Sequence, residues 1–367
     1  MSPEIPKQGE AFLNRFTKNY DDWLSSPNKN QEDVPKRNYL SAGALNKREG
    51  ETEEKDRVET NSELPGHEIY GFDNEIKSLK NFLLDQKVYN QFKSLVVVGE
   101  YGVGKTALCK TIFNDEDVKS VYAPRIWVSM HSDGPKEGLD GKISVLKKML
   151  TFLDVKVSIL EDIKTYAIEE YNSNVEAGID GESAKEKELS ALLYALHLNL
   201  RWKKYLIVLD DVREEDNWNE MLHDDEEKLK KDKRWGKYLS DGFPKGSGGR
   251  VIYTTRDENK NLAKKLVAEE HEIHRLWPLT DSQSVWKIYD AARIENGEND
   301  PPRNNKKCIE ELMNKSRGLP LAVRLLATLL PVFLDDENPD QNGSTQGTTA
   351  SDNTTTEQNG STQPPTA

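Results

Sequence analysis

Short apolar runs alternate with helical patterns through the middle of the chain. The apolar runs, rich in Val, Ile and Leu, are residues 94–98, 126–128, 205–209, 251–255 and 273–276. Between them, apolar residues recur at helical spacing, as in 76–83 and 189–196. Strands that are apolar throughout are buried on both faces, which is typical of a parallel sheet between two layers of helices. The pattern therefore predicts an α/β fold in which helices flank a parallel sheet.

After residue 276 the strand pattern stops and three helical patterns follow. They cover residues 278–292, 306–316 and 320–330. Asp281 has the side chain of an N-cap, Gly318 suits the position just after a helix, and Pro320 suits the first position inside one. We therefore predict a small helical domain behind the sheet.

The two ends of the chain differ from its middle. Phe12, Phe16, Tyr20 and Trp23 recur at helical spacing, and this face either docks a partner or packs on the protein's own body. Residues 49–60 form a charged linker, and two further charged stretches, 156–186 and 219–247, are expected to be surface excursions. The C-terminal tail, residues 335–367, is polar, cannot bury apolar surface and is expected to be disordered. The predicted divisions are an N-terminal extension over 1–65, a nucleotide-binding domain over 66–276, the helical domain over 277–334 and the tail over 335–367.

Composition and charge narrow the classes of function. The 367-residue chain carries 51 Lys and Arg against 64 Asp and Glu, a net charge of −13. Nucleic-acid binding needs a concentrated basic surface, so this balance argues against nucleic acid as a partner. No apolar run approaches the roughly 20 residues of a membrane span, and no apolar signal segment opens the chain. The two cysteines are too few for a disulfide framework. We expect a cytoplasmic protein without a transmembrane segment.

The strongest motif is a glycine-rich turn between an apolar run and a helical pattern. Residues 99–106 read Gly-Glu-Tyr-Gly-Val-Gly-Lys-Thr, which fits the phosphate-binding pattern G-x4-G-K-[ST]. Glycines let backbone N–H groups surround phosphate oxygens at the positive end of a helix. Lys105 would reach the β- and γ-phosphates of a nucleotide, and the Thr106 hydroxyl would ligate Mg²⁺. The nucleotide-binding residues predicted here are Gly99, Gly102, Val103, Gly104, Lys105, Thr106 and Ala107.

Two further strand ends carry charged residues. Asp210 and Asp211 follow the run 205–209, so their carboxylates emerge at the edge of the sheet where ligands bind in open α/β folds. Asp210 would hold Mg²⁺, and Asp211 would orient or deprotonate an attacking water. Arg256 ends the run 251–255 and would neutralise a γ-phosphate. Taken alone, the acids also fit an ordinary turn, and the arginine also fits a surface ion pair.

Together these motifs resemble the nucleotide-binding (NB-ARC) domain of plant immune receptors of the NLR class. The matching stretches, in chain order, are 67–71, 99–106, 125–129, 206–212, 249–256, 276–279 with Trp286, and Gly-Leu-Pro-Leu-Ala over 318–322. The resemblance is to a short stand-alone form, without the coiled-coil or TIR domain, the winged-helix domain or the leucine-rich repeats. Arg213 stands where related receptors usually have Trp, and Phe72 stands where they often have Arg.

The resemblance implies a switch that binds ADP or ATP with Mg²⁺. It implies that Ile69 and Tyr70 lie near the adenine, that Pro320 approaches the nucleotide from the helical domain, and that Arg256 senses the phosphate. It also implies protein partners in plant defence signalling. Two alternatives remain beside the switch: a slow Mg²⁺-dependent ATPase, and an interaction scaffold whose nucleotide is structural.

Overall fold

The computed structural model describes residues 59–85, 90–130, 138–178, 181–213, 239–256, 260–267, 270–297 and 306–329. The predicted N-terminal helical stripe, most of the charged linker 49–60 and the polar tail 335–367 lie outside these residues. The described part contains the whole predicted sheet, the phosphate-binding loop and the three helices that follow.

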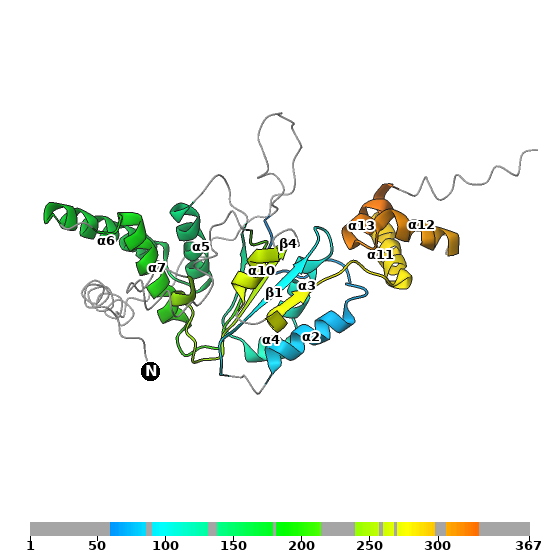
Figure 1. The fold of residues 1–367 in the computed structure, drawn as a ribbon, viewed down its shortest axis with the longest axis horizontal. Helices are drawn as coiled ribbons and strands as arrows, with labels where there is room; N and C mark the ends of the chain where they lie inside the picture. Colours follow the sequence, from blue (N-terminus) through cyan, green and yellow to red (C-terminus); the bar gives the residue numbers. More distant parts are fainter. Residues whose placement is uncertain are drawn as a thin grey trace, which may run out of the picture.

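Five parallel strands form one sheet in the order β2-β3-β4-β1-β5 (Figure 1). Their bounds are Lys93–Gly99 for β1, Arg125–Ser129 for β2, Leu206–Asp210 for β3, Arg250–Arg256 for β4 and Ile273–Arg275 for β5. Every predicted strand is present, and no predicted strand end is displaced by more than one residue. The sheet is parallel throughout, so the expectation drawn from continuous apolar runs is confirmed.

Helices cover both faces of the sheet because successive side chains along each strand point to opposite sides. In β1, Val96 and Val98 pack into one core cluster, and Leu95 and Val97 pack into the other. The first cluster is closed by α5 (Leu139–Phe152), α6 (Val157–Glu176), α7 (Ala184–Leu200), η4 (Leu239–Gly242) and α10 (Lys260–Leu266). The second is closed by α2 (Asp73–Leu84), α3 (Lys105–Phe113) and α4 (Glu116–Val121), and the short turn η5 (Glu270–Glu272) leads into β5.

The charged stretch 156–186 is not only a surface excursion, as the sequence suggested. Most of it forms the 20-residue helix α6, which packs Ile159, Leu160 and Ile163 against the core. Glu161 and Asp162 stand between Leu160 and Ile163, and the acidic composition hid the helical spacing of the apolar residues. Among the described residues, no helix combines the length and the apolar character that crossing a membrane requires.

Three helices form the predicted helical domain beyond the sheet (Figure 1). They are α11 (Ser282–Glu295), α12 (Lys306–Ser316) and α13 (Pro320–Leu329). The expectation that the first helix starts at residue 278 is wrong, because the Asp281 side chain accepts hydrogen bonds from the backbone N–H groups of Gln283 and Ser284 and sets the start there. Residues 277–280 instead run as an extended linker from the sheet.

Candidate nucleotide-binding site

The strand register brings the predicted site residues to one edge of the sheet. Gly99 at the end of β1 pairs with Arg256 at the end of β4, and Ser129 at the end of β2 pairs with Asp210 at the end of β3. All four residues end parallel strands, so they share the carboxyl edge where open α/β sheets bind ligands.

The glycine-rich loop joins β1 to α3 at this edge. Gly104 has φ +106°, and a Cβ placed on it would lie 3.5 Å from the ring of Phe72. Val103, within the loop, is fully buried, and Ala107 belongs to the first turn of α3. A left-handed residue just before a helix turns backbone N–H groups toward a common point, which is the geometry of an anion-binding nest.

Lys105 places its ammonium group inside this loop. Its Nζ donates to the carbonyl oxygens of Gly99 at 2.8 Å and Glu100 at 2.9 Å. The side chain is buried, and this burial lowers the pKa of its ammonium below the ordinary lysine value. Both hydrogen-bond partners within the described part of the chain are neutral carbonyls, so the positive charge is desolvated and would be stabilised by an anion.

Thr106 and Asp210 lie together beside the loop. The Thr106 hydroxyl is 3.0 Å and 3.1 Å from the two carboxylate oxygens of Asp210, and the Thr254 hydroxyl donates to Asp210 Oδ1 at 2.7 Å. Burial raises the pKa of the Asp210 carboxyl, and the hydroxyl donors around it oppose that rise. A hydroxyl and a carboxylate oxygen side by side are hard ligands of the kind that Mg²⁺ prefers, so these two residues fit the predicted metal site.

Asp211 has a different environment from its neighbour. Its backbone has φ +62°, and its carboxylate pairs with Arg213 at 3.1 Å and with Arg256 at 3.5 Å. The guanidinium of Arg256 in turn lies 4.9 Å from the centre of the Tyr101 ring, on the glycine-rich loop. The predicted base and the predicted phosphate sensor therefore form one ion-paired group.

The helical domain reaches the loop through the start of α13. The backbone N–H of Leu321 donates to the carbonyl of Gly102 at 3.1 Å, which brings its neighbour Pro320 to the glycine-rich loop. Ile69 and Tyr70 are partly buried in the core cluster that includes α11, and Lys287 of α11 lies 5.9 Å from the Tyr70 ring centre. Ile69 and Tyr70, predicted near the adenine, therefore contact the helical domain, and Pro320 of that domain lies at the loop.

Comparison with known proteins identifies the family. The NB-ARC domain family matches residues 72–231. A probable disease resistance protein of Arabidopsis thaliana is 64% identical over 362 residues, which cover 96% of this chain and 97% of the relative. A second from the same plant is 63% identical over 341 residues, covering 93% of this chain and 91% of the relative. The chain belongs to the NB-ARC family of disease resistance proteins.

Among solved structures, Cdc6p from Pyrobaculum aerophilum aligns with the NB-ARC chain at a TM-score of 0.43 and 12% identity. The alignment covers 74% of this chain and 62% of that one. The family match includes the glycine-rich loop, Asp210 and Asp211, whereas Arg256, Pro320, Ile69 and Tyr70 lie outside it.

Two residues near the NB-ARC site were not predicted to belong to it. Phe72 is 3% exposed, and its ring fills the space next to Gly104, so it supports the loop from below. Arg213 adds a second guanidinium to Asp211. Both positions depart from the usual family pattern, and that departure was the one signal in the sequence that pointed to them.

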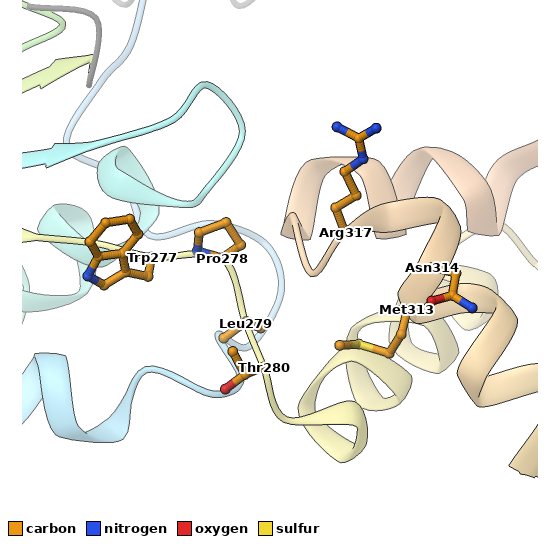
Figure 2. A pocket seen from close by; sticks show the side chains of 7 residues that line it. All are labelled: Trp277, Pro278, Leu279, Thr280, Met313, Asn314 and Arg317. Carbon is orange, nitrogen blue, oxygen red and sulfur yellow. The ribbon is translucent and has the colours of Figure 1, made fainter.

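A cavity of about 620 Å³ lies between the linker that leaves the sheet and the end of α12 (Figure 2). Its lining comes from the linker 277–280 and from the end of α12, with Met313, Asn314 and Arg317. In Figure 2, Trp277 and Pro278 lie on one side of this space, and Met313, Asn314 and Arg317 lie on the other. The cavity shares no lining residue with the predicted nucleotide-binding residues. Its lining comes from the linker and from the helical domain, so it belongs to the joint between the two domains.

Proposed function

We propose that this NB-ARC protein binds ADP and ATP with Mg²⁺ at the 99–106 loop and acts as a nucleotide-controlled switch in plant defence, in the cytoplasm. The observation that carries the proposal is the Lys105 ammonium, held inside the loop by neutral carbonyls beside the Thr106 and Asp210 pair. A desolvated cation next to a nest of backbone N–H groups has the charge and shape to receive phosphates. The defence role rests on the names of the Arabidopsis thaliana relatives.

Each part of the site has a distinct task in this proposal. Backbone N–H groups of the loop and the Lys105 ammonium bind the phosphates, while Thr106 and Asp210 would hold Mg²⁺. Bound Mg²⁺ supplies neutralisation of the phosphate charge. Ile69 and Tyr70 lie on the adenine side, Pro320 approaches the nucleotide from the helical domain, and Arg256 responds to the γ-phosphate.

The contact between α13 and the loop supplies a route for switching. The Leu321 N–H bonds to the carbonyl of Gly102, so a change in the loop's conformation on phosphate binding acts directly on the start of α13. The Leu279 N–H bonds to the carbonyl of Gly318 at 2.9 Å and ties the same helix end to the linker. The helical domain is thereby attached to the phosphate-binding loop, where ATP would place a γ-phosphate that ADP lacks.

The direct test is to denature the purified protein and identify any released nucleotide by chromatography. We expect about one ADP or ATP per chain from the wild type and none from Lys105→Ala. Equal amounts of nucleotide released from both proteins would show that it binds elsewhere, which contradicts the proposed site.

Removing Arg256 is expected to affect ATP more than ADP. Its guanidinium lies at the loop, stacked on Tyr101 and paired with Asp211, where it would be available to a γ-phosphate. We expect Arg256→Ala to weaken ATP binding about tenfold, or about 1.4 kcal/mol, and ADP binding by less than about twofold. Titration of the stripped protein with each nucleotide measures this difference.

The matched control is Arg275→Ala, at the end of the edge strand β5. Arg275 also stacks on an aromatic ring, lying 5.0 Å from the centre of Trp277, but it is on the far side of β1 from Asp211. It should leave both affinities unchanged. Equal loss of ADP and ATP affinity in Arg256→Ala would refute its role as a γ-phosphate sensor.

Slow ATP hydrolysis is a second candidate function, favoured by the place of Asp211 directly after Asp210 at the sheet edge. Its carboxylate is ion-paired with Arg213 and Arg256 and is therefore already engaged, so we expect slow turnover. Asp211→Asn should lower phosphate release about 100-fold, or to background, with ADP affinity retained. Identical release rates in wild type and variant would exclude Asp211 as the base.

A further inference from the structure

Residues 60–62, here called the strap, precede the NB-ARC match in the sequence. They cross the carboxyl edge of the sheet. The backbone N–H of Thr60 donates to the Ser129 hydroxyl at 3.1 Å, which fixes the strap to the end of β2. The Asn114 side chain donates to the carbonyl of Ser62 at 2.6 Å, which fixes it to the end of α3. The strap is therefore held at two points beside the metal side of the nucleotide site.

The Thr60 hydroxyl has a fixed direction in this arrangement. The indole N–H of Trp127 donates to Thr60 Oγ1 at 3.1 Å, and Thr60 Oγ1 donates to Asp210 Oδ2 at 2.8 Å. An indole nitrogen can only donate, and an ionised carboxylate can only accept, so the single hydroxyl proton points at Asp210. Trp127 thus sets the orientation of the group that contacts the predicted metal ligand.

Asp210 is held from both sides by hydroxyl groups. Thr254 donates to Oδ1 at 2.7 Å, Thr60 donates to Oδ2, and Thr106 lies within 3.1 Å of both oxygens. The residue is 1% exposed, so these donors stand in for the water that would otherwise solvate the carboxylate. With Thr254 and Thr60 fixing the carboxylate plane, the side that faces Thr106 is the one presented to a metal.

We propose that Thr60 is a positioning residue, which holds the Asp210 carboxylate in the orientation that receives Mg²⁺ together with the nucleotide. The inference rests on the proposed function and adds to it a residue outside the NB-ARC match. Partners that orient metal ligands typically contribute 10- to 100-fold to metal affinity.

Thr60→Val tests this role because it keeps the shape of the side chain and removes only the hydroxyl. The release rate of a fluorescent ADP, mant-ADP, is measured from the full chain in Mg²⁺ and again in EDTA. In the wild type, Mg²⁺ slows release; in Thr60→Val, we expect that slowing to shrink about tenfold, with the EDTA rate unchanged. Thr60→Ser keeps the hydroxyl and should behave as the wild type.

Thr151→Val is the matched control, since the Thr151 hydroxyl lies on the exposed surface of α5 and donates to the carbonyl of Lys147 in the same helix at 2.8 Å. It should leave both rates unchanged. If Thr60→Val keeps the full effect of Mg²⁺, or speeds release by the same factor in Mg²⁺ and in EDTA, the positioning role is refuted. A wild type that binds no mant-ADP refutes the proposed function instead.

Discussion

Lys105→Ala is expected to lower the affinity for both ADP and ATP by about 100-fold or more. A buried charge that meets a ligand charge typically contributes about 2–5 kcal/mol, and the Lys105 ammonium is already desolvated inside the loop. Desolvation of this charge opposes folding, so its removal should not lower the free energy of unfolding through the charge itself. Fluorescence titration with mant-ADP measures the affinity, and thermal unfolding measures the fold.

The matched control for Lys105 is Lys119→Ala on α4. Lys119 pairs with Glu116 on the exposed surface of the same helix, a pair that contributes little to stability. The control should bind nucleotide as the wild type does. Unchanged affinity in Lys105→Ala would mean that the phosphates do not enter this loop.

Gly318→Ala is expected to separate the start of α13 from the linker. Gly318 has φ +70°, and a Cβ placed on it would lie 2.0 Å from the carbonyl oxygen of Leu279. That oxygen belongs to the backbone, and moving it breaks the 2.9 Å hydrogen bond from the Leu279 N–H to the Gly318 carbonyl. We expect the free energy of unfolding to fall by about 3 kcal/mol, and nucleotide affinity to fall with the displaced helix.

Gly178→Ala separates the clash at Gly318 from the backbone strain. Gly178 has φ +67°, close to that of Gly318, but a Cβ placed on it would meet nothing within 4 Å. The control should lose only about 1 kcal/mol, the cost of a left-handed alanine. Equal losses of stability in the two variants would show that the contact with Leu279 does not govern the joint. Chemical denaturation of both proteins measures the difference.

The sheet and the central site residues were predictable because their signals are local and repeated. Four of the five apolar runs are strands buried on both faces, so composition alone marks them, whereas the edge strand β5 is only partly buried. Parallel strands end at one edge, so a glycine-rich turn after one strand and Asp210 after another had to come close together. The register confirms this convergence for Gly99, Arg256 and Asp210.

The rest depended on contacts between distant parts of the chain. Thr60 lies in a charged stretch without apolar periodicity, and only the folded sheet brings it to Asp210, 150 positions away in the sequence. Asp211 has a left-handed backbone and pairs with Arg213, and nothing in the strand pattern indicates either feature. Helix α6 was hidden because charged residues outnumber its buried face.

Calorimetric titration of nucleotide-stripped protein with ADP in Mg²⁺ tests the central claim most directly. The account predicts saturable binding of about one ADP per wild-type chain, and affinity lower by about 100-fold in Lys105→Ala. A wild-type chain that is folded and shows no heat of binding with ADP, and none with ATP, would contradict it.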